Sequence, residues 1–302
     1  MVSKKKLVVI CGPTAVGKTA VGIEIAKAFN TVVLNSDSRQ LYKELNIGVA
    51  KPSQEELSSV KHVLIGTHSV TELYGAGDFE KEALALLNEL YKTTNVVVVV
   101  GGTGLYLKAL YEGLDDLPGA DEAYRSELKE VFEEKGILGL QELLQQKDSA
   151  ALLSIDKQNP QRLMRALEII HLSGKKYSDL LLSKKANRPF DIIKIGLNLP
   201  REELYQRINS RVDKMMEEGL LEEVKALDAF RDYNALKTVG YKELFDYLDG
   251  KMSLPEAVDK IKQHTRNYAK RQITWFKADE EVQWFEPSQI NAIKTYLESK
   301  VN

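Results

Sequence analysis

A phosphate-binding loop is the clearest chemical feature of this chain. Residues 12–19 match the P-loop pattern G-x-x-x-x-G-K-[ST]. In this pattern the glycines let backbone N–H groups point at a phosphate, the lysine reaches the terminal phosphates, and the hydroxyl is a Mg²⁺ ligand. We therefore expect a di- or triphosphate, with Mg²⁺ on Thr19, bound by Gly12, Pro13, Thr14, Ala15, Val16, Gly17, Lys18 and Thr19.

A polar run at residues 35–42 follows an apolar segment that ends at Leu34. Side chains at the carboxyl edge of a parallel sheet face the ligand crevice, so Asp37 is expected there. Its carboxylate is suited to accept a proton, to ligate Mg²⁺, or to cap a helix that begins at Ser38. Position in the sequence does not choose among these three roles.

The apolar segment Val96–Val100 ends in Gly101-Gly102-Thr103-Gly104. P-loop ATPases often place an acidic residue that holds Mg²⁺ after such a strand, and none follows here. Hydrolysis of a γ-phosphate is therefore not supported. Small residues instead allow a second ligand to approach the backbone, with Thr103 donating to an anion or a base. A tight strand-to-helix turn is the alternative.

Arg207 and Arg211 are four residues apart in a predicted helix, so their side chains share a face. Two guanidiniums on one face suit a phosphate clamp, because their charge is fixed and their donors fork. The alternative is a solvated face on which Arg211 pairs with Asp213 or Glu218.

Two further helical segments carry candidate RNA contacts. Asn159-Pro160 predicts a capped helix start, and Gln161 and Arg165 lie off the apolar stripe of this helix. Residues 262–277 hold five basic residues and no acidic one, together with aromatic side chains. Cations mixed with aromatics suit single-stranded RNA. Ordinary helix-surface charge in the first segment, and a buried aromatic core in the second, are the alternatives.

These segments require an α/β framework to bring them together. Apolar runs of mostly non-alternating residues predict buried parallel strands, and helical patterns between several of them predict right-handed βαβ units. The predicted strands are 7–11, 31–34, 62–65, 96–100 and 192–197. The predicted helices include 20–29 and 78–92 and, later in the chain, 201–209 running into 215–230, 239–248 and 255–276.

A long helical stretch separates the fourth and fifth predicted strands. It has breaks at residues 135–136, 159–160 and 173–174. We interpret residues 118–189 as a helical insertion in a P-loop α/β core formed by residues 1–117 and 190–302. The core is thus expected to be a P-loop NTPase-like parallel sheet flanked by helices, with a helical C-terminal part.

Composition excludes several classes of protein. The chain has 302 residues and a formal net charge of −2, so it is not basic as a whole. A single cysteine rules out an internal disulfide and fits a reducing cytosol, and the four histidines lack metal-ligand spacing. The longest uncharged stretch, residues 93–107, is too short to span a membrane. We expect a cytoplasmic monomer.

Taken together and in this order, the motifs resemble those of the tRNA dimethylallyltransferase family of bacterial type. One departure is Gly66-Thr67, where the family more often has an acidic residue, which leaves any role of that acid open. The matching segments cover nearly the whole chain: 12–19, 37–42, 47–52, 101–106, 160–168, 207–215, 240–243 and 268–275.

The resemblance implies transfer of a five-carbon allyl group from dimethylallyl diphosphate to N6 of the adenosine 3′ of the anticodon. The P-loop would hold the diphosphate rather than ATP, with Lys18, Thr19, Mg²⁺, Arg207 and Arg211 stabilising its charge. Asp37 would be the general base, and Thr103 would assist. The insertion would grip the anticodon stem-loop. The implied tRNA contacts are Asp37, Ser38, Arg39, Gln40, Thr103, Arg125, Gln161, Arg162, Leu163, Met164 and Arg165, to which the basic helix adds Arg266, Lys270 and Arg271.

Three other functions share some of these features. An enzyme that prenylates free AMP, ADP or ATP would share the P-loop and Asp37 but would not need the insertion. A nucleotide or metabolite kinase would bind ATP tightly and release ADP. An RNA-binding module would bind a stem-loop and leave its mass unchanged.

Overall fold

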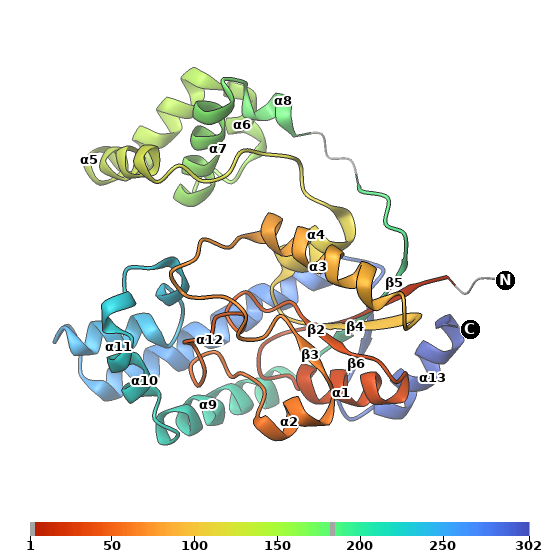
Figure 1. The fold of residues 1–302 in the computed structure, drawn as a ribbon. Helices are drawn as coiled ribbons and strands as arrows, with labels where there is room; N and C mark the ends of the chain where they lie inside the picture. Colours follow the sequence, from red (N-terminus) through yellow and green to blue (C-terminus); the bar gives the residue numbers. More distant parts are fainter. Residues whose placement is uncertain (1–3, 182–184, 302) are drawn as a thin grey trace. The chain divides into compact units, whose positions relative to one another are not determined.

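A six-stranded parallel sheet is the centre of the larger part of the molecule (Figure 1). The computed structural model describes residues 4–181 and 185–301. Every neighbouring pair of strands runs parallel, which confirms the predicted sheet. In spatial order the strands are β3 (His62–Val63), β2 (Val33–Asn35), β4 (Val96–Val100), β1 (Lys6–Cys11), β5 (Asp191–Leu197) and β6 (Gln283–Phe285).

Both faces of the sheet are buried, which explains why its strands lack a polar face. Along β1, Leu7 and Val9 point into one hydrophobic cluster, whereas Val8 and Ile10 point into the other. Successive strand residues face opposite sides, so each apolar run supplies both clusters. Helices α3 and α4 cover one face, and α1 and α13 cover the other (Figure 1).

The helices of this part are spread along the chain on both sides of the insertion. Their bounds are α1 (Lys18–Ala28), α2 (Gln54–Ser59), α3 (Ala76–Leu90), α4 (Gly104–Glu112), α9 (Arg201–Glu217), α10 (Leu220–Ala226), α11 (Tyr241–Leu248), α12 (Leu254–Lys277) and α13 (Ile290–Val301). Two short 3₁₀ helices are η1 (Asp228–Phe230) and η2 (Asn234–Leu236).

The insertion is a separate helical unit. The chain divides into residues 1–111 with 187–302 and residues 112–186, where we expected boundaries at 118 and 189. The smaller unit has its own buried cluster, which includes Leu128, Leu140, Leu144 and Leu167. Its helices are α5 (Glu122–Lys147), α6 (Ser149–Ser154), α7 (Pro160–Ser173) and α8 (Tyr177–Leu180).

Most predicted elements exist, but several boundaries differ. The expected strand at 62–65 is limited to His62–Val63, because Leu64 adopts a left-handed conformation with φ 61°. The expected helix at 215–230 is broken at Gly219, whose φ of 98° ends α9 and begins α10. Strand β6 and helix α13 were not predicted. None of the helices within residues 4–181 and 185–301 is long and apolar enough to cross a membrane.

Candidate active site

The P-loop lies between β1 and α1, as the sequence predicted. Gly12 has φ 142°, and a Cβ at this position would lie 2.4 Å from the carbonyl oxygen of Leu197 on β5. Glycine is required here by both the backbone conformation and the space. Helix α1 begins at Lys18, so its N-terminus points its free N–H groups and partial positive charge at the loop.

Lys18 is folded back over the loop. Its Nζ donates to the carbonyl oxygens of Gly12 at 3.1 Å and Pro13 at 2.7 Å. Burial lowers the pKa of Lys18 to about 8; the charge of Asp37 opposes this shift and that of Arg211 adds to it. A partly buried ammonium at the N-terminus of a helix is a strong attractor for a phosphate oxygen.

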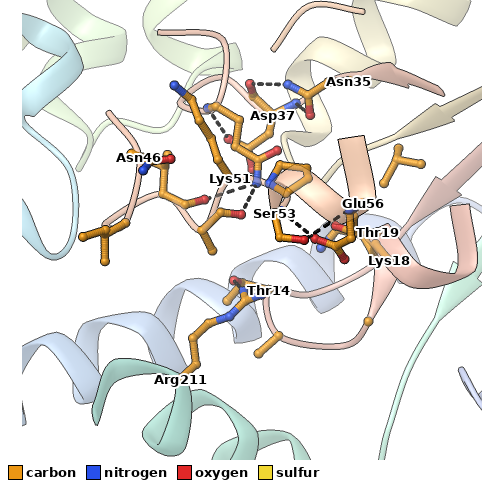
Figure 2. Close-up of a pocket in the computed structure, with 18 of the residues that line it drawn as sticks. Thr14, Lys18, Thr19, Asn35, Asp37, Asn46, Lys51, Ser53, Glu56 and Arg211 are labelled. Atoms are coloured by element: carbon orange, nitrogen blue, oxygen red, sulfur yellow. Dashed lines mark hydrogen bonds between the residues drawn. The ribbon is translucent and has the colours of Figure 1, made fainter. Parts of the chain in front are cut away.

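A cavity of about 570 Å³ opens in front of this loop, and we call it the P-loop cavity. Figure 2 shows Asp37 and Arg211 reaching it from opposite sides, with Lys18 and Thr19 at one end. Its further lining residues include Thr14, Asn35, Gln40, Asn46, Lys51, Ser53, Glu56, Lys214 and Gln272. The cavity therefore gathers cations and backbone donors from segments far apart in the sequence.

The structure brings Arg211 to this cavity but not Arg207. Arg211 is partly buried, its Nη1 donates to Thr14 Oγ1 at 3.4 Å, and desolvation lowers its pKa. Its suggested partners are engaged elsewhere, Asp213 with Lys262 and Glu218 with Lys214. Arg207 is exposed and pairs with Glu203 at 2.9 Å on the same helix.

Asp37 caps a turn through one carboxylate oxygen and also lines the P-loop cavity. Its Oδ1 accepts from the backbone N–H groups of Arg39 at 2.9 Å and Gln40 at 3.3 Å. The capped segment is a turn, not the α-helix expected from Ser38. Beside it, Thr103 Oγ1 accepts from Ser38 N at 3.1 Å and donates to Ser38 Oγ at 3.3 Å.

A second cavity of about 380 Å³, the side cavity, shares a wall with the first. The wall common to both is formed by Thr14, Asp37, Val49, Ala50, Arg211, Met215 and Tyr268. Its other lining is largely apolar and adds Ser38, Arg39, Gly48, Thr103, Val212, Leu220, Thr238, Val239, Gly240, Ile261 and Thr265.

Several residues of the side cavity have no role predicted from the sequence. Thr238 and Val239 lie just before the motif at residues 240–243, and Thr265 lies inside the basic helix. Burial raises the pKa of Tyr268 to about 12, and the charge of Asp37 adds to the shift. Tyr268 therefore remains a neutral phenol between the two cavities.

The glycines after β4 admit a helix rather than a ligand. A Cβ on Gly102 would lie 2.2 Å from Gln272 Nε2, and one on Gly104 would lie 2.2 Å from Trp275 Nε1. The expectation that a ligand approaches the backbone at these two glycines is therefore wrong, because α12 fills that space. Gly101 still lines the P-loop cavity.

The three basic residues of α12 that were predicted to contact tRNA lie beside two different tyrosine rings. Arg266 and Lys270 lie near the ring of Tyr205, and Arg266 Nη1 donates to Asn209 Oδ1 at 2.6 Å. Arg271 lies over the ring of Tyr268, 5.7 Å from its centroid. Of the aromatic residues of this run, Phe276 is core, Tyr268 lines both cavities, and Trp275 is 42 % exposed.

In the helical unit, Glu168 organises two of the candidate RNA contacts. Arg125 and Arg165 both donate to Glu168 Oε2, at 2.8 and 2.6 Å, and Glu168 is fully buried. Leu163 and Met164 are buried in the core of this unit. Their side chains are therefore not available to tRNA, contrary to expectation, whereas Gln161 and Arg162 are exposed.

Known proteins resemble this chain over most of its length. The model of the "IPP transferase" family matches residues 40–279. A tRNA dimethylallyltransferase of Bacteroides thetaiotaomicron is 47 % identical over 291 residues, which is 96 % of this chain and 94 % of the relative. One of Cytophaga hutchinsonii is 47 % identical over 297 residues and 98 % of each chain.

Solved structures extend the similarity to the fold. A tRNA isopentenylpyrophosphate transferase of Bacillus halodurans has a TM-score of 0.73 and is 39 % identical, covering 99 % of this chain and 97 % of its own. A eukaryotic dimethylallyltransferase crystallised in the act of modifying tRNA has a TM-score of 0.77 and is 27 % identical, covering 98 % of this chain and 80 % of its own. This chain therefore belongs to the IPP transferase family and is a prenyl-transferring enzyme of the tRNA dimethylallyltransferase type.

Proposed function

We propose that this protein transfers a dimethylallyl group from dimethylallyl diphosphate to N6 of the adenosine immediately 3′ of the anticodon in tRNA. The observation that carries the proposal is the position of Asp37 in the wall shared by the two cavities. On one side lie the cationic groups of a diphosphate site, and on the other lies a largely apolar cavity beside Thr103. A base between a leaving-group site and an acceptor site suits alkyl transfer.

The electron flow follows from these positions. The N6 lone pair attacks C1 of the allyl group, the bond from C1 to the ester oxygen of the α-phosphate breaks, and diphosphate departs with the bonding pair. N6 then loses one proton, and the carboxylate of Asp37 accepts it. An exocyclic amine is a poor nucleophile, so a base at hydrogen-bonding distance supports bond formation. Lys18, Arg211 and the loop N–H groups stabilise the charge that develops on the diphosphate.

The residues present fit a Mg²⁺ ion that is held mainly by the substrate. Thr19 lines the P-loop cavity together with Asp37 and Glu56. Among the described residues, no group of three or more His, Cys, Asp or Glu forms a metal site. Mg²⁺ bound to phosphates keeps several waters and needs only one or two protein ligands. We propose Thr19 as that ligand; the ion would neutralise charge on the diphosphate.

The tRNA would be held by the helical unit and by residues around Asp37. Arg125, Gln161, Arg162 and Arg165 are polar residues of the helical unit suited to a phosphate backbone. A target base leaves a single-stranded loop at lower cost than a duplex, because fewer stacking and pairing contacts are lost.

The test is the mass of an unmodified anticodon stem-loop with adenosines 3′ of the anticodon. The protein is incubated with this RNA, Mg²⁺ and dimethylallyl diphosphate. We expect a gain of one C5H8 unit, and no gain when ATP replaces the donor. A gain on free AMP but not on RNA would instead indicate an adenylate prenyltransferase. ATP consumption without any gain would indicate a kinase, and stem-loop binding at unchanged mass would indicate a binding module.

A further inference from the structure

Gln272 on α12 makes two hydrogen bonds that link the two halves of the active site. Its Oε1 accepts from the backbone N–H of Thr14 in the P-loop at 2.8 Å. Its Nε2 donates to the backbone carbonyl of Gly102 after β4, also at 2.8 Å. The side chain is 5 % exposed, so both ends of the amide are satisfied inside the protein.

The two segments that Gln272 joins serve different substrates under the proposed function, on which this inference rests. Thr14 belongs to the P-loop, which carries Lys18 and Thr19 and would bind the diphosphate. The Gly102 side continues into Thr103, which accepts from Ser38 N next to Asp37. No hydrogen bond between backbone groups of the P-loop and residues 102–104 is present in the described parts of the chain.

Space around Gly102 makes the link rigid. A Cβ at Gly102 would lie 2.2 Å from Gln272 Nε2 and 3.4 Å from Lys18 Nζ. The amide group of Gln272, the ammonium of Lys18 and the Gly102 backbone are therefore packed together. A buried amide that is bonded at both ends fixes the separation of its two partners.

We infer that Gln272 is a positioning residue that holds the diphosphate site at its working distance from Asp37 and Thr103. Its amide is engaged by the Thr14 N–H and the Gly102 carbonyl, so we assign it an action through these two groups rather than on the reacting atoms. Its effect is on the alignment of the allyl C1 with the attacking amine. Displacement of reacting groups by about 1 Å costs about 100-fold in rate, so loss of this link should slow the chemical step.

The kinetic test uses Gln272→Met, which keeps the length of the side chain but loses both hydrogen bonds. A second variant, Gln272→Glu, keeps an acceptor for Thr14 N but loses the donor to Gly102. Single-turnover transfer from bound donor should slow about 10- to 100-fold in both variants. In Gln272→Met the dissociation constant of inorganic pyrophosphate should change little, because Lys18 and the loop N–H groups remain. In Gln272→Glu it should rise, because the carboxylate adds negative charge beside Lys18. Gln263→Met, at an exposed position of the same helix, is the matched control.

A purely structural role gives a different pattern. It would lower the melting temperature of both variants and leave the single-turnover rate of the folded enzyme at the wild-type value. That result would overturn the inference. A wild-type enzyme that transfers nothing to RNA would instead refute the proposed function.

A measurement that needs no turnover tests the role of Gln272 independently of the proposed function. Inorganic pyrophosphate is added to the full-length ¹⁵N-labelled protein, and the amide signals of Ser38 and Thr103 are followed. In the wild type both should shift with saturation of the P-loop, and in Gln272→Met the shifts should be confined to the P-loop. Equal shifts of Ser38 and Thr103 in both proteins would show that Gln272 does not couple the two halves.

Discussion

The two carboxylate oxygens of Asp37 have different surroundings. Oδ1 holds the turn through Arg39 N and Gln40 N. Among the described residues, no hydrogen bond to Oδ2 is found, although Asp37 lines both cavities. One oxygen therefore has a structural role, and the other remains available to an incoming amine.

This division makes Asp37→Asn an informative substitution. The amide oxygen can still cap the turn, whereas the second position becomes an N–H donor that cannot accept a proton. We expect kcat to fall about 10²- to 10⁴-fold with little change in melting temperature. Single-turnover mass measurement and thermal unfolding check both parts. Asp37→Ala, which also removes the cap, is the control and should lower stability as well. A wild-type rate in Asp37→Asn would exclude Asp37 as the base.

Cys11 gives a prediction that depends on pH. Burial raises the pKa of its thiol from the usual 9.0 to about 12. Only the thiolate reacts with alkylating reagents, and its fraction at pH 8 falls as the pKa rises. We expect the native protein to resist iodoacetamide at pH 8 and to become labelled at one site in denaturant. Rapid labelling of the native protein at pH 8 would contradict this burial.

At the scale of elements, the segment of residues 46–51 depends on α10 and α11. Glu223 Oε2 accepts from Ile47 N at 2.7 Å, and Oε1 accepts from Gly48 N at 3.1 Å and from the Tyr241 hydroxyl at 2.6 Å. The segment lines the P-loop cavity through Asn46, Ile47 and residues 49–51. One carboxylate therefore fixes a wall of the active site.

Removal of this carboxylate should affect both stability and donor binding. Glu223→Ala leaves three partly buried donors without their acceptor, which costs about 1–3 kcal/mol of unfolding free energy per unsatisfied group. We also expect KM for dimethylallyl diphosphate to rise, because the cavity wall loosens. Urea unfolding and steady-state kinetics measure the two effects. Glu222→Ala removes an exposed carboxylate next to it and should change neither quantity.

The sequence predicted elements well where the pattern is long and local. The run of valines at residues 96–100 coincides with β4, and the P-loop lies between a strand and a helix as expected. Strand β6 has three residues, too few for a periodic signal, and it forms through pairing with β5. Gln272 occupies the space beside Gly102. The two residues are 170 positions apart in the sequence, so no local pattern predicts their contact.

The candidate site shows the same limit. The P-loop motif, Asp37, Thr103 and Arg211 come from short motifs, and the structure gathers them around two adjoining cavities. Helical spacing predicted the same phosphate-binding role for Arg207 and Arg211. Spacing does not show which end of the shared helix face lies at the P-loop cavity, and only Arg211 lies there. Leu163 and Met164 were included with their motif, although their apolar side chains form the core of the helical unit.

At the scale of the whole molecule, the two units have independent hydrophobic cores. Residues 112–186 bury their own cluster, and the sheet clusters draw on residues outside this range. Separate cores allow separate unfolding. We therefore expect that removal of the insertion leaves the sheet folded.

Replacement of residues 112–186 by a short Gly-Ser linker tests this independence. We expect the remaining unit to unfold cooperatively and to bind inorganic pyrophosphate with the affinity of the full chain. Its affinity for the anticodon stem-loop should fall sharply, because the proposed contacts Arg125, Gln161, Arg162 and Arg165 are gone. Calorimetry and filter binding measure these properties. An unfolded product would show that the sheet needs the insertion, and unchanged stem-loop affinity would place the RNA contacts elsewhere.

The position of β5 has a consequence for how the chain is made. Strand β1 pairs along its whole length with β5, yet more than half of the chain is synthesised between β1 and the end of β5. On the ribosome, β1 through β4 emerge first, with one edge of β1 lacking its partner. The helical insertion, whose contacts are local, is next to emerge and can fold at once. The exposed edge of β1 gains its partner strand only when β5 emerges. We therefore expect a nascent chain that ends before residue 191 to be the species that most needs a chaperone.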